Sequence, residues 1–237
     1  MDKKVVTVKI NELRALMPFA GSDESRYVLR SILVEAKPGF RAILAATNGR
    51  AIAVLQSDAE LCSEKEAFEV LLPTEAIKDV LKLKKKEDEF MVATVTRETI
   101  AVGFPNSKRL VSFPNESWEW TFPKWRQAIP KQSKGKSLAH GAINPHLIAP
   151  FANAVKCLTG QSDHGLRMHQ AIEDGPISVR CHACNNFFGV LMPMLGDCDE
   201  PALPDWLALE VEPAVIEKPT APVFETKTEA APETCAA

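Results

Sequence analysis

The sequence lacks the features by which membrane proteins and secreted proteins are recognised. No apolar run in its 237 residues approaches the roughly 20 residues that a membrane-spanning helix needs, and the N-terminal MDKKVV lacks the apolar segment of a signal peptide. The six cysteines are scattered without the spacing of a disulfide framework, which favours free thiols in a reducing compartment. We therefore expect a cytoplasmic protein with no membrane partner.

Catalytic motifs are also missing. The chain has no Gly-rich phosphate loop, no G-x-S-x-G elbow and no H-E-x-x-H motif. Its acidic residues lie mostly beside lysines or in expected turns, so no pair of carboxylates is indicated for acid–base chemistry. We identify no catalytic residue, no metal site and no cofactor, and we expect that the protein is not an enzyme.

One cysteine pair has the spacing of a zinc site. Cys181 and Cys184 form a C-x-x-C arrangement, but a second such pair does not occur. Further ligands would have to come from Cys198, His140, His164 and His169. The segment is predicted to be a strand, in which the two thiols would point to opposite faces. Small, half-buried side chains are therefore favoured over the alternative of a metal site.

Charge divides the chain into a body and a tail. The formal net charge is -3, and the stretch from residue 202 onward carries -5 of it, which leaves about +2 on the rest. Six prolines lie between Pro201 and Pro232, and apolar residues are few, so residues 197–237 are predicted to be a disordered acidic tail. Its apolar exceptions, Trp206 to Leu209, could pack on the body or occupy a binding site on it.

The body, whose chain has 46% hydrophobic residues, shows one repeated order of elements. In the first unit, Val5–Lys9 is expected to be a strand, and Asn11 is expected to cap a helix. Antiparallel strands between Arg26 and Leu55 follow, with a tight turn at Asn48 and Gly49, which tolerate positive φ.

Two further units follow this order, with a period of roughly 65 to 70 residues. The second has a strand at 68–72, a helix opened by Pro73-Thr74, and strands between residues 91 and 113. The third has a strand at 138–143, a helix opened by Asn144-Pro145, and strands between residues 165 and 192, with a turn at Asn185-Asn186.

Three stretches resemble the bacterial DNA sliding clamp, the β subunit of DNA polymerase III. They are RYVLRSILVEAKPGFRAILAATNGRAIAVL from Arg26, FPKWRQAIPK from Phe122 and VLMPM from Val190, which are similar to the family's middle domain, interdomain segment and C-terminal segment. The resemblance implies an α+β DNA-clamp fold of repeated strand-helix-antiparallel-strand half-domains, with helices on one face of the sheets. It assigns a complete domain to 1–131, with half-repeats at about 1–57 and 66–131, and the second half of a C-terminal domain to 137–196.

The function that the resemblance implies is that of a processivity factor in DNA replication. Such an accessory subunit of DNA-directed DNA polymerase is nucleoid-associated, and it tethers polymerase or repair proteins to double-stranded DNA without sequence specificity. Because an odd number of half-domains leaves one without an internal partner, we expect a homo-oligomer in which dimers complete a ring. The alternative is a ring-less relative, a peptide-binding module that competes for or regulates clamp partners.

Two surfaces follow from the resemblance. The first is a cleft for short apolar peptides of DNA polymerase, clamp loader or repair proteins, and its lining would be Leu29, Thr47, Gly49, Arg50, Ile52, Pro123, Val190, Leu191, Met192, Pro193 and Met194. The second is a helix face that would contact DNA phosphates through Arg14, Lys78, Lys82, Lys84, Lys85, Lys86 and Lys156.

Ordinary structural roles remain alternatives for both surfaces. A run of lysines is most often a solvated face, and Glu87 to Glu89 partly offset Lys82 to Lys86. The stretch Val190 to Met192 could fill the core of an edge strand. Ala51 and Gln127 depart from the family pattern, which predicts a cleft of similar position but of altered polarity and depth.

Overall fold

The computed structural model describes residues 3–23, 25–38, 40–57, 67–105, 110–115, 119–130, 143–170 and 175–194. The first unit comprises β1 (Lys4–Lys9), α1 (Ile10–Leu16), the 3₁₀ helices η1 (Met17–Phe19) and η2 (Tyr27–Arg30), β2 (Ser31–Ala36), β3 (Ile43–Thr47) and β4 (Ala51–Gln56). The second comprises β5 (Phe68–Pro73), α2 (Thr74–Leu81), β6 (Phe90–Val95), β7 (Thr99–Gly103) and β8 (Leu110–Pro114). The connector η3 (Trp125–Ala128) precedes the third unit, α3 (Pro145–Thr159), β9 (Leu166–Gln170), β10 (Ile177–Cys181) and β11 (Cys184–Leu191).

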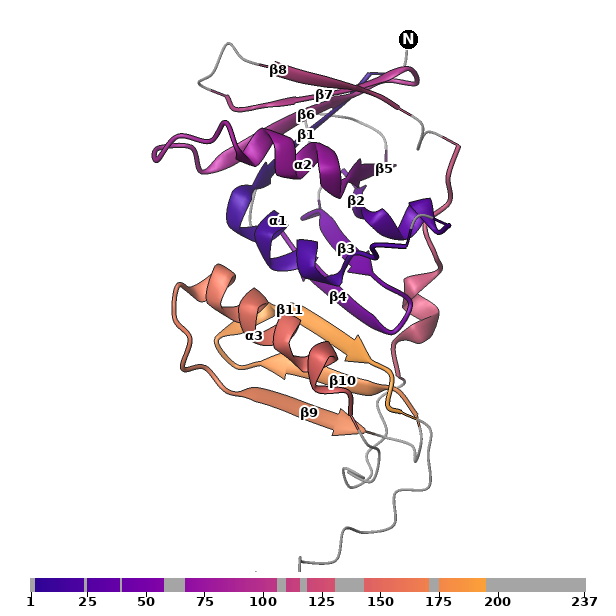
Figure 1. The fold of residues 1–237 in the computed structure, drawn as a ribbon, viewed down its shortest axis with the longest axis vertical. Coiled ribbons are helices and arrows are strands. Elements are labelled where there is room, and N and C mark those ends of the chain that lie inside the picture. The colour runs from indigo at the N-terminus through magenta and orange to yellow at the C-terminus, as the bar shows by residue number, and fades with distance from the viewer. Residues whose placement is uncertain are drawn as a thin grey trace, which may run out of the picture. The chain divides into compact units, whose positions relative to one another are not determined.

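The strands form two antiparallel sheets, as expected for an α+β protein. One has four strands in the order β1-β6-β7-β8, and the other has seven in the order β5-β2-β3-β4-β11-β10-β9. The first two units exchange their opening strands, because β1 pairs with β6 and β5 pairs with β2. The helices α1, α2 and α3 lie over one face of the sheets (Figure 1).

The third unit continues the seven-stranded sheet rather than standing alone. Strand β11 pairs with β4, with Val190 opposite Ile52, and α3 packs against α1. This pairing corrects the expectation that an odd unit lacks an internal partner. The described end strands are β1 and β8 in one sheet and β5 and β9 in the other, so any unpaired edges lie at these four strands and not at β11.

Three phenylalanine rings fill the junction between the first and third units. The centroids of Phe19 and Phe151 lie 4.7 Å apart in an edge-to-face arrangement, and Phe187 lies 6.3 Å from Phe151. Gly189 permits this packing, since a Cβ atom there would lie 2.0 Å from Cε1 of Phe151. The junction is therefore part of one core, which runs beneath all three helices.

The other face of the seven-stranded sheet is covered by a segment that contains η3. Phe122 and Trp125 of this segment pack on Leu33, Ala45 and Leu71. Two clusters thus sandwich the sheet, an inner one beneath the helices and a smaller outer one beneath the connector. We call these two sides the inner face and the outer face.

Some local expectations need correction. Asn11 does not cap α1, which begins at Ile10 after Lys9. Asn185 and Asn186 lie inside β11, and the turn of that hairpin falls at residues 182–183. By contrast, Asn144 caps α3 as predicted, since its Oδ1 accepts a hydrogen bond from the N–H of His146 at 2.9 Å.

Some predictions fall where the structure gives no description. These concern most of the strand expected at 138–143, and the acidic tail with Trp206 to Leu209. Among the described helices, none combines the length and the apolar character that a membrane crossing requires.

Candidate functional site

The β4–β11 junction brings most residues of the predicted peptide cleft to one end of the sheet. Leu29 of η2 lies beside the β3–β4 turn, because a Cβ atom on Gly49 would be 3.9 Å from its Cδ1. Ile52 of β4 and Val190 of β11 are register partners and so share the outer face. Segments that are more than 130 residues apart in sequence therefore meet at one place.

The turn between β3 and β4 is held by its own side chains. Oδ1 of Asn48 accepts hydrogen bonds from the N–H groups of Arg50 and Ala51 at 2.9 and 2.8 Å. Oγ1 of Thr47 donates to the carbonyl of Ala51 at 2.8 Å. Gly49 has a φ of 85°, which glycine adopts without strain. A turn forms at the predicted place, but its central residues are Gly49 and Arg50, because Asn48 lies opposite Ala51 and its N–H donates to the carbonyl of Ala51 at 3.3 Å.

The end of β11 is tied to this turn. The N–H of Met192 donates to the carbonyl of Arg50 at 2.9 Å, which fixes the start of the Met192–Met194 segment beside the turn. The side chains of Met192 and Met194 are 45% and 53% exposed. Two flexible apolar side chains thus face solvent at the junction, which suits recognition of varied apolar groups.

Not all predicted cleft residues line a surface. Leu191 is fully buried in the inner core, on the opposite face from Val190, and so cannot contact a peptide on the outer face. Val190 and Thr47 are also buried, at 3% and 2% exposure, and would form the floor rather than the walls. The sequence argument missed Arg26, whose Nη1 would lie 3.4 Å from a Cβ on Gly49.

Pro123 belongs to the connector, which a polar anchor holds on the outer face. Glu35 of β2 accepts hydrogen bonds from Nε1 of Trp125 at 3.0 Å and from Nη1 and Nη2 of Arg126 at 2.7 and 2.5 Å. Burial opposes ionisation of Glu35, but the hydrogen bonds from Arg126 and Trp125 outweigh it and lower the pKa of this carboxyl. The anchor therefore positions the exposed Pro123 beside the outer cluster.

The predicted DNA-facing residues are surface residues of the helices and of the turn after α2. Arg14, Lys84 and Lys86 line one hollow with Lys9, and Asp88 and Glu89 of the same hollow offset part of this positive charge. Asp88 is buried and accepts a hydrogen bond from the N–H of Lys85 at 2.8 Å, so it closes this turn. Lys82 is 2.7 Å from Asp79, which partly neutralises it. Lys78 and Lys156 are exposed on α2 and α3.

The cysteine pair differs from its prediction. Cys181 and Cys184 face each other across the β10–β11 hairpin, and both are buried in the inner core. They therefore share one face, because the chain turns between them. Burial, together with the adjacent Cys181, raises the pKa of the Cys184 thiol to about 11. Within the described residues, no three His, Cys, Asp or Glu side chains gather as metal ligands would.

The architecture and the junction define a DNA-clamp fold. No family model matches the sequence, and no curated protein matches it. Solved structures of bacterial sliding clamps, the β subunit of DNA polymerase III, match along most of the chain.

Three of these structures illustrate the likeness. The Borrelia burgdorferi β subunit in complex with a natural product superposes with a TM-score of 0.59 and 15% identity, over 81% of this chain and 63% of that one. The Helicobacter pylori clamp bound to a DNA ligase peptide superposes with a TM-score of 0.62 and 13% identity, over 83% of this chain and 67% of that one. The Pseudomonas aeruginosa clamp bound to griselimycin superposes with a TM-score of 0.57 and 16% identity, over 81% of this chain and 66% of that one. The chain thus has the fold of a sliding clamp and spans about two thirds of the length of these clamps.

Proposed function

We propose that this protein is a clamp-like scaffold that binds apolar peptide segments of DNA polymerase, clamp loader or repair proteins and holds them at double-stranded DNA. The observation that carries the proposal is the β4–β11 junction. Leu29, the Asn48 turn and the exposed Met192–Met194 segment lie around this junction, and Val190 is buried between them, which supports a peptide site there. The Helicobacter pylori clamp, which has the same fold, is bound to a DNA ligase peptide.

The peptide-binding step is tested with a known clamp ligand. Griselimycin, bound to the Pseudomonas aeruginosa clamp, is titrated into this protein by isothermal calorimetry, together with short peptides that contain leucine and phenylalanine. We expect saturable binding that is weakened by Gly49→Val, since this side chain would approach Leu29 and Arg26. Saturable binding that Gly49→Val leaves unchanged, or no binding, would contradict the proposed cleft.

Tethering to DNA rests on the charge of the helix side. The exposed cations of α1, α2, α3 and the α2–β6 turn would contact phosphates without reading bases, which gives a binding constant that falls with salt. An Arg14→Glu variant is expected to weaken this binding, whereas the Lys82→Glu variant weakens it less because Lys82 already pairs with Asp79. Equal loss in both variants, measured by fluorescence anisotropy on duplex DNA, would contradict this assignment.

Ring formation requires oligomers. Strands β8 and β9 each end one sheet of the described structure, opposite β1 and β5, and strand edges of this kind pair with neighbouring chains unless they are covered. We infer that copies of the chain associate there, which would allow retention on closed circular DNA and release from linear DNA.

A second candidate function is favoured by the same junction. Since the third unit is completed internally by β4, the cleft elements assemble within one chain and need no ring. A ring-less module would bind clamp partners and compete for them. Light scattering at several concentrations separates the candidates, because a closed oligomer supports the ring, and a monomer at every concentration leaves the module.

A further inference from the structure

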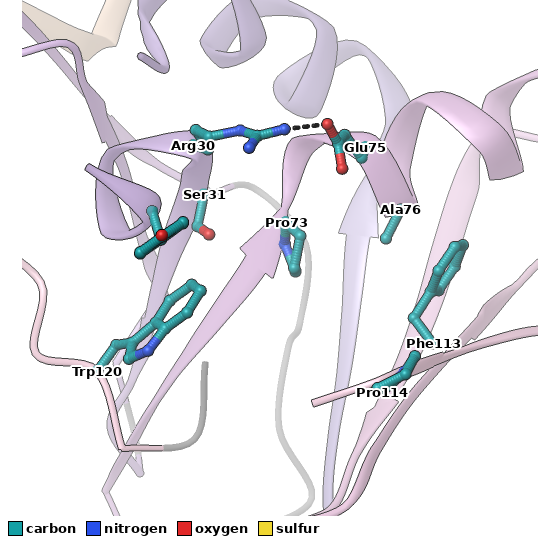
Figure 2. A pocket seen from close by; sticks show the side chains of 9 residues that line it. Arg30, Ser31, Pro73, Glu75, Ala76, Phe113, Pro114 and Trp120 are labelled. Carbon is teal, nitrogen blue, oxygen red and sulfur yellow. Dashed lines mark hydrogen bonds and ion pairs between the residues drawn. The ribbon is translucent and has the colours of Figure 1, made fainter. Parts of the chain in front are cut away.

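A pocket that the proposed function does not use lies between the two sheets. It has a volume of about 220 Å³ and lies at the junction of β2, β5, β8 and the first turn of α2. Figure 2 shows its lining, with Ser31, Pro73 and Trp120 facing Phe113 and Pro114 of β8. The pocket lies apart from the candidate cleft, although η2 contributes to both, Leu29 to the cleft and Tyr27 to the pocket.

The floor of the pocket contains an unsatisfied hydroxyl. Ser31 is 1% exposed, and its Oγ has no hydrogen-bond partner within the described part of the chain. A buried hydroxyl without a partner costs about 1–3 kcal/mol, so such groups are rare unless a ligand or water satisfies them. Its register partner on β5 is Pro73, which has no backbone N–H to offer.

The walls select a flat apolar group. The rings of Tyr27 and Trp120 stack with centroids 5.6 Å apart and an interplanar angle of 24°, and they form one aromatic wall. Phe113 and the proline rings of Pro73 and Pro114 provide apolar surface around it. Planar rings pack well on aromatic and proline surfaces through offset stacking and edge contacts.

The rim sets the charge of the occupant. Arg30 and Glu75 form an ion pair there, shown by the dashed line in Figure 2. Because the two charges neutralise each other, the rim does not favour a charged ligand. The volume corresponds to about seven water molecules at liquid density, or to one small ring system. A neutral ring with one hydrogen-bonding atom therefore fits both the lining and the size.

We propose that this pocket, which we call the Ser31 pocket, binds a neutral aromatic group that carries one hydroxyl or N–H, of the phenol or indole class. The ring packs against Tyr27, Trp120 and Phe113, and its polar atom exchanges a hydrogen bond with Oγ of Ser31. The source of the ring is either a free small molecule or a tyrosine or tryptophan side chain of a partner protein.

The experiment compares two probes that differ by one hydroxyl. The ¹⁵N-labelled full chain is titrated with p-cresol and with toluene, and the indole N–H signal of Trp120, assigned with Trp120→Phe, is followed by NMR. We expect saturable shifts of this signal with a Kd for p-cresol of about 0.1–5 mM, as ligand efficiency allows for so small a molecule. We expect toluene to bind about 5- to 30-fold more weakly, because it leaves the hydroxyl unpaired.

Two serine variants isolate the hydrogen bond. Ser31→Ala is expected to reduce the preference for p-cresol to within about twofold, while it keeps or strengthens toluene binding. Ser178→Ala is the matched control, since Ser178 is also buried but its Oγ already donates to the carbonyl of His169 at 3.0 Å. This control should retain the full preference for p-cresol.

Several results would overturn the proposal. They are an absence of shifts up to 10 mM p-cresol, equal affinity for the two probes in the unmodified chain, and shifts that centre on Arg50 and Met192 instead of Trp120. N-acetyl-tyrosinamide distinguishes the source. Affinity equal to or above that of p-cresol supports a partner side chain, and affinity more than tenfold lower supports a free small molecule.

Discussion

The two faces of the seven-stranded sheet are built in different ways. The inner face is closed by three helices and by the Phe19–Phe151–Phe187 cluster, where a glycine hydrogen is all that fits beneath a ring. The outer face is covered by one connector that a single polar anchor at Glu35 holds. Close packing beneath the Phe151 ring leaves no room for a ligand, whereas the sparser cover of the outer face leaves a hollow lined by Leu33, Leu71, Trp120 and Phe122. The inner core is therefore expected to contribute most to stability, and peptide binding is proposed for the outer face, while the solvent side of the helices is proposed to contact DNA.

The largest difference between the faces should appear on removal of an aromatic ring. Phe151→Ala is expected to lower the free energy of unfolding by about 3–5 kcal/mol, because it leaves a cavity in the close-packed junction. The matched variant Phe188→Ala removes a ring from the outer face, where the side chain is only partly buried, and should cost less than half as much. Urea unfolding measures both. Similar losses would show that the two faces are equally well packed.

The alkylation rate of Cys184 gives a second measure of how closely the inner face is packed. Because the pKa of Cys184 is raised to about 11, its thiolate fraction at pH 8 should be at least about 100-fold below that of an ordinary thiol with a pKa of about 8.5. Alkylation by iodoacetamide, quantified by peptide mass spectrometry, should be slower by about tenfold or more, because the greater nucleophilicity of a more basic thiolate offsets part of the decrease in thiolate fraction. In concentrated urea the difference should vanish. Fast alkylation of the folded protein would mean that the hairpin opens readily.

The outer face should respond to pH through its anchor. The pKa of Glu35 is lowered in the folded state, so its contribution is fully present above the unfolded pKa of about 4.3 and is lost as the pH falls through the lower folded value. Glu35→Gln should cost about 1–3 kcal/mol at pH 7, and should show a weaker loss of stability between pH 4.5 and pH 2. Glu119→Gln, which changes an exposed carboxylate, is the control. If the stability of the Glu35→Gln variant fell with decreasing pH as much as that of the unmodified protein, the Glu35 anchor would not explain the acid sensitivity.

The smallest effect on stability is expected at the exposed methionines. Met192→Ala and Met168→Ala remove side chains of nearly equal exposure, 45% and 43%, and each should change the free energy of unfolding by no more than about 0.5 kcal/mol. Only Met192→Ala should weaken griselimycin or peptide binding, by about tenfold, since Met168 lies on β9 away from the junction. Equal effects on calorimetric affinity would argue against a cleft at Met192.

Local order was largely predictable from the sequence, because local signals specify it. Asn48-Gly49 predicted the β3–β4 turn, and Asn144-Pro145 predicted the start of α3. The hairpin turn at residues 182–183 contains no glycine, proline or asparagine, so the sequence favoured a turn at Asn185-Asn186, which lie inside β11 instead.

Long-range pairing was not predictable from local signals. The β4–β11 register joins Ile52 and Val190, which are 138 positions apart, and the Glu35–Arg126 anchor joins residues that are 91 positions apart. The residues next to them in sequence do not predict either contact. For the candidate site, the family resemblance selected segments that meet at the β4–β11 junction. It could not show that Leu191 points inward, because that depends on the register of β11 against β4.

The distance between β4 and β11 along the chain also sets an order of events during synthesis. Ile52 is made 138 residues before its partner Val190, which takes about 7–28 s at ordinary rates of translation. Throughout that interval the nascent first unit carries an open strand edge and the apolar surface of Phe19. The connectivity therefore delays completion of the seven-stranded sheet until the third unit has been made, and slowing elongation after residue 57 is expected to lower the yield of native protein.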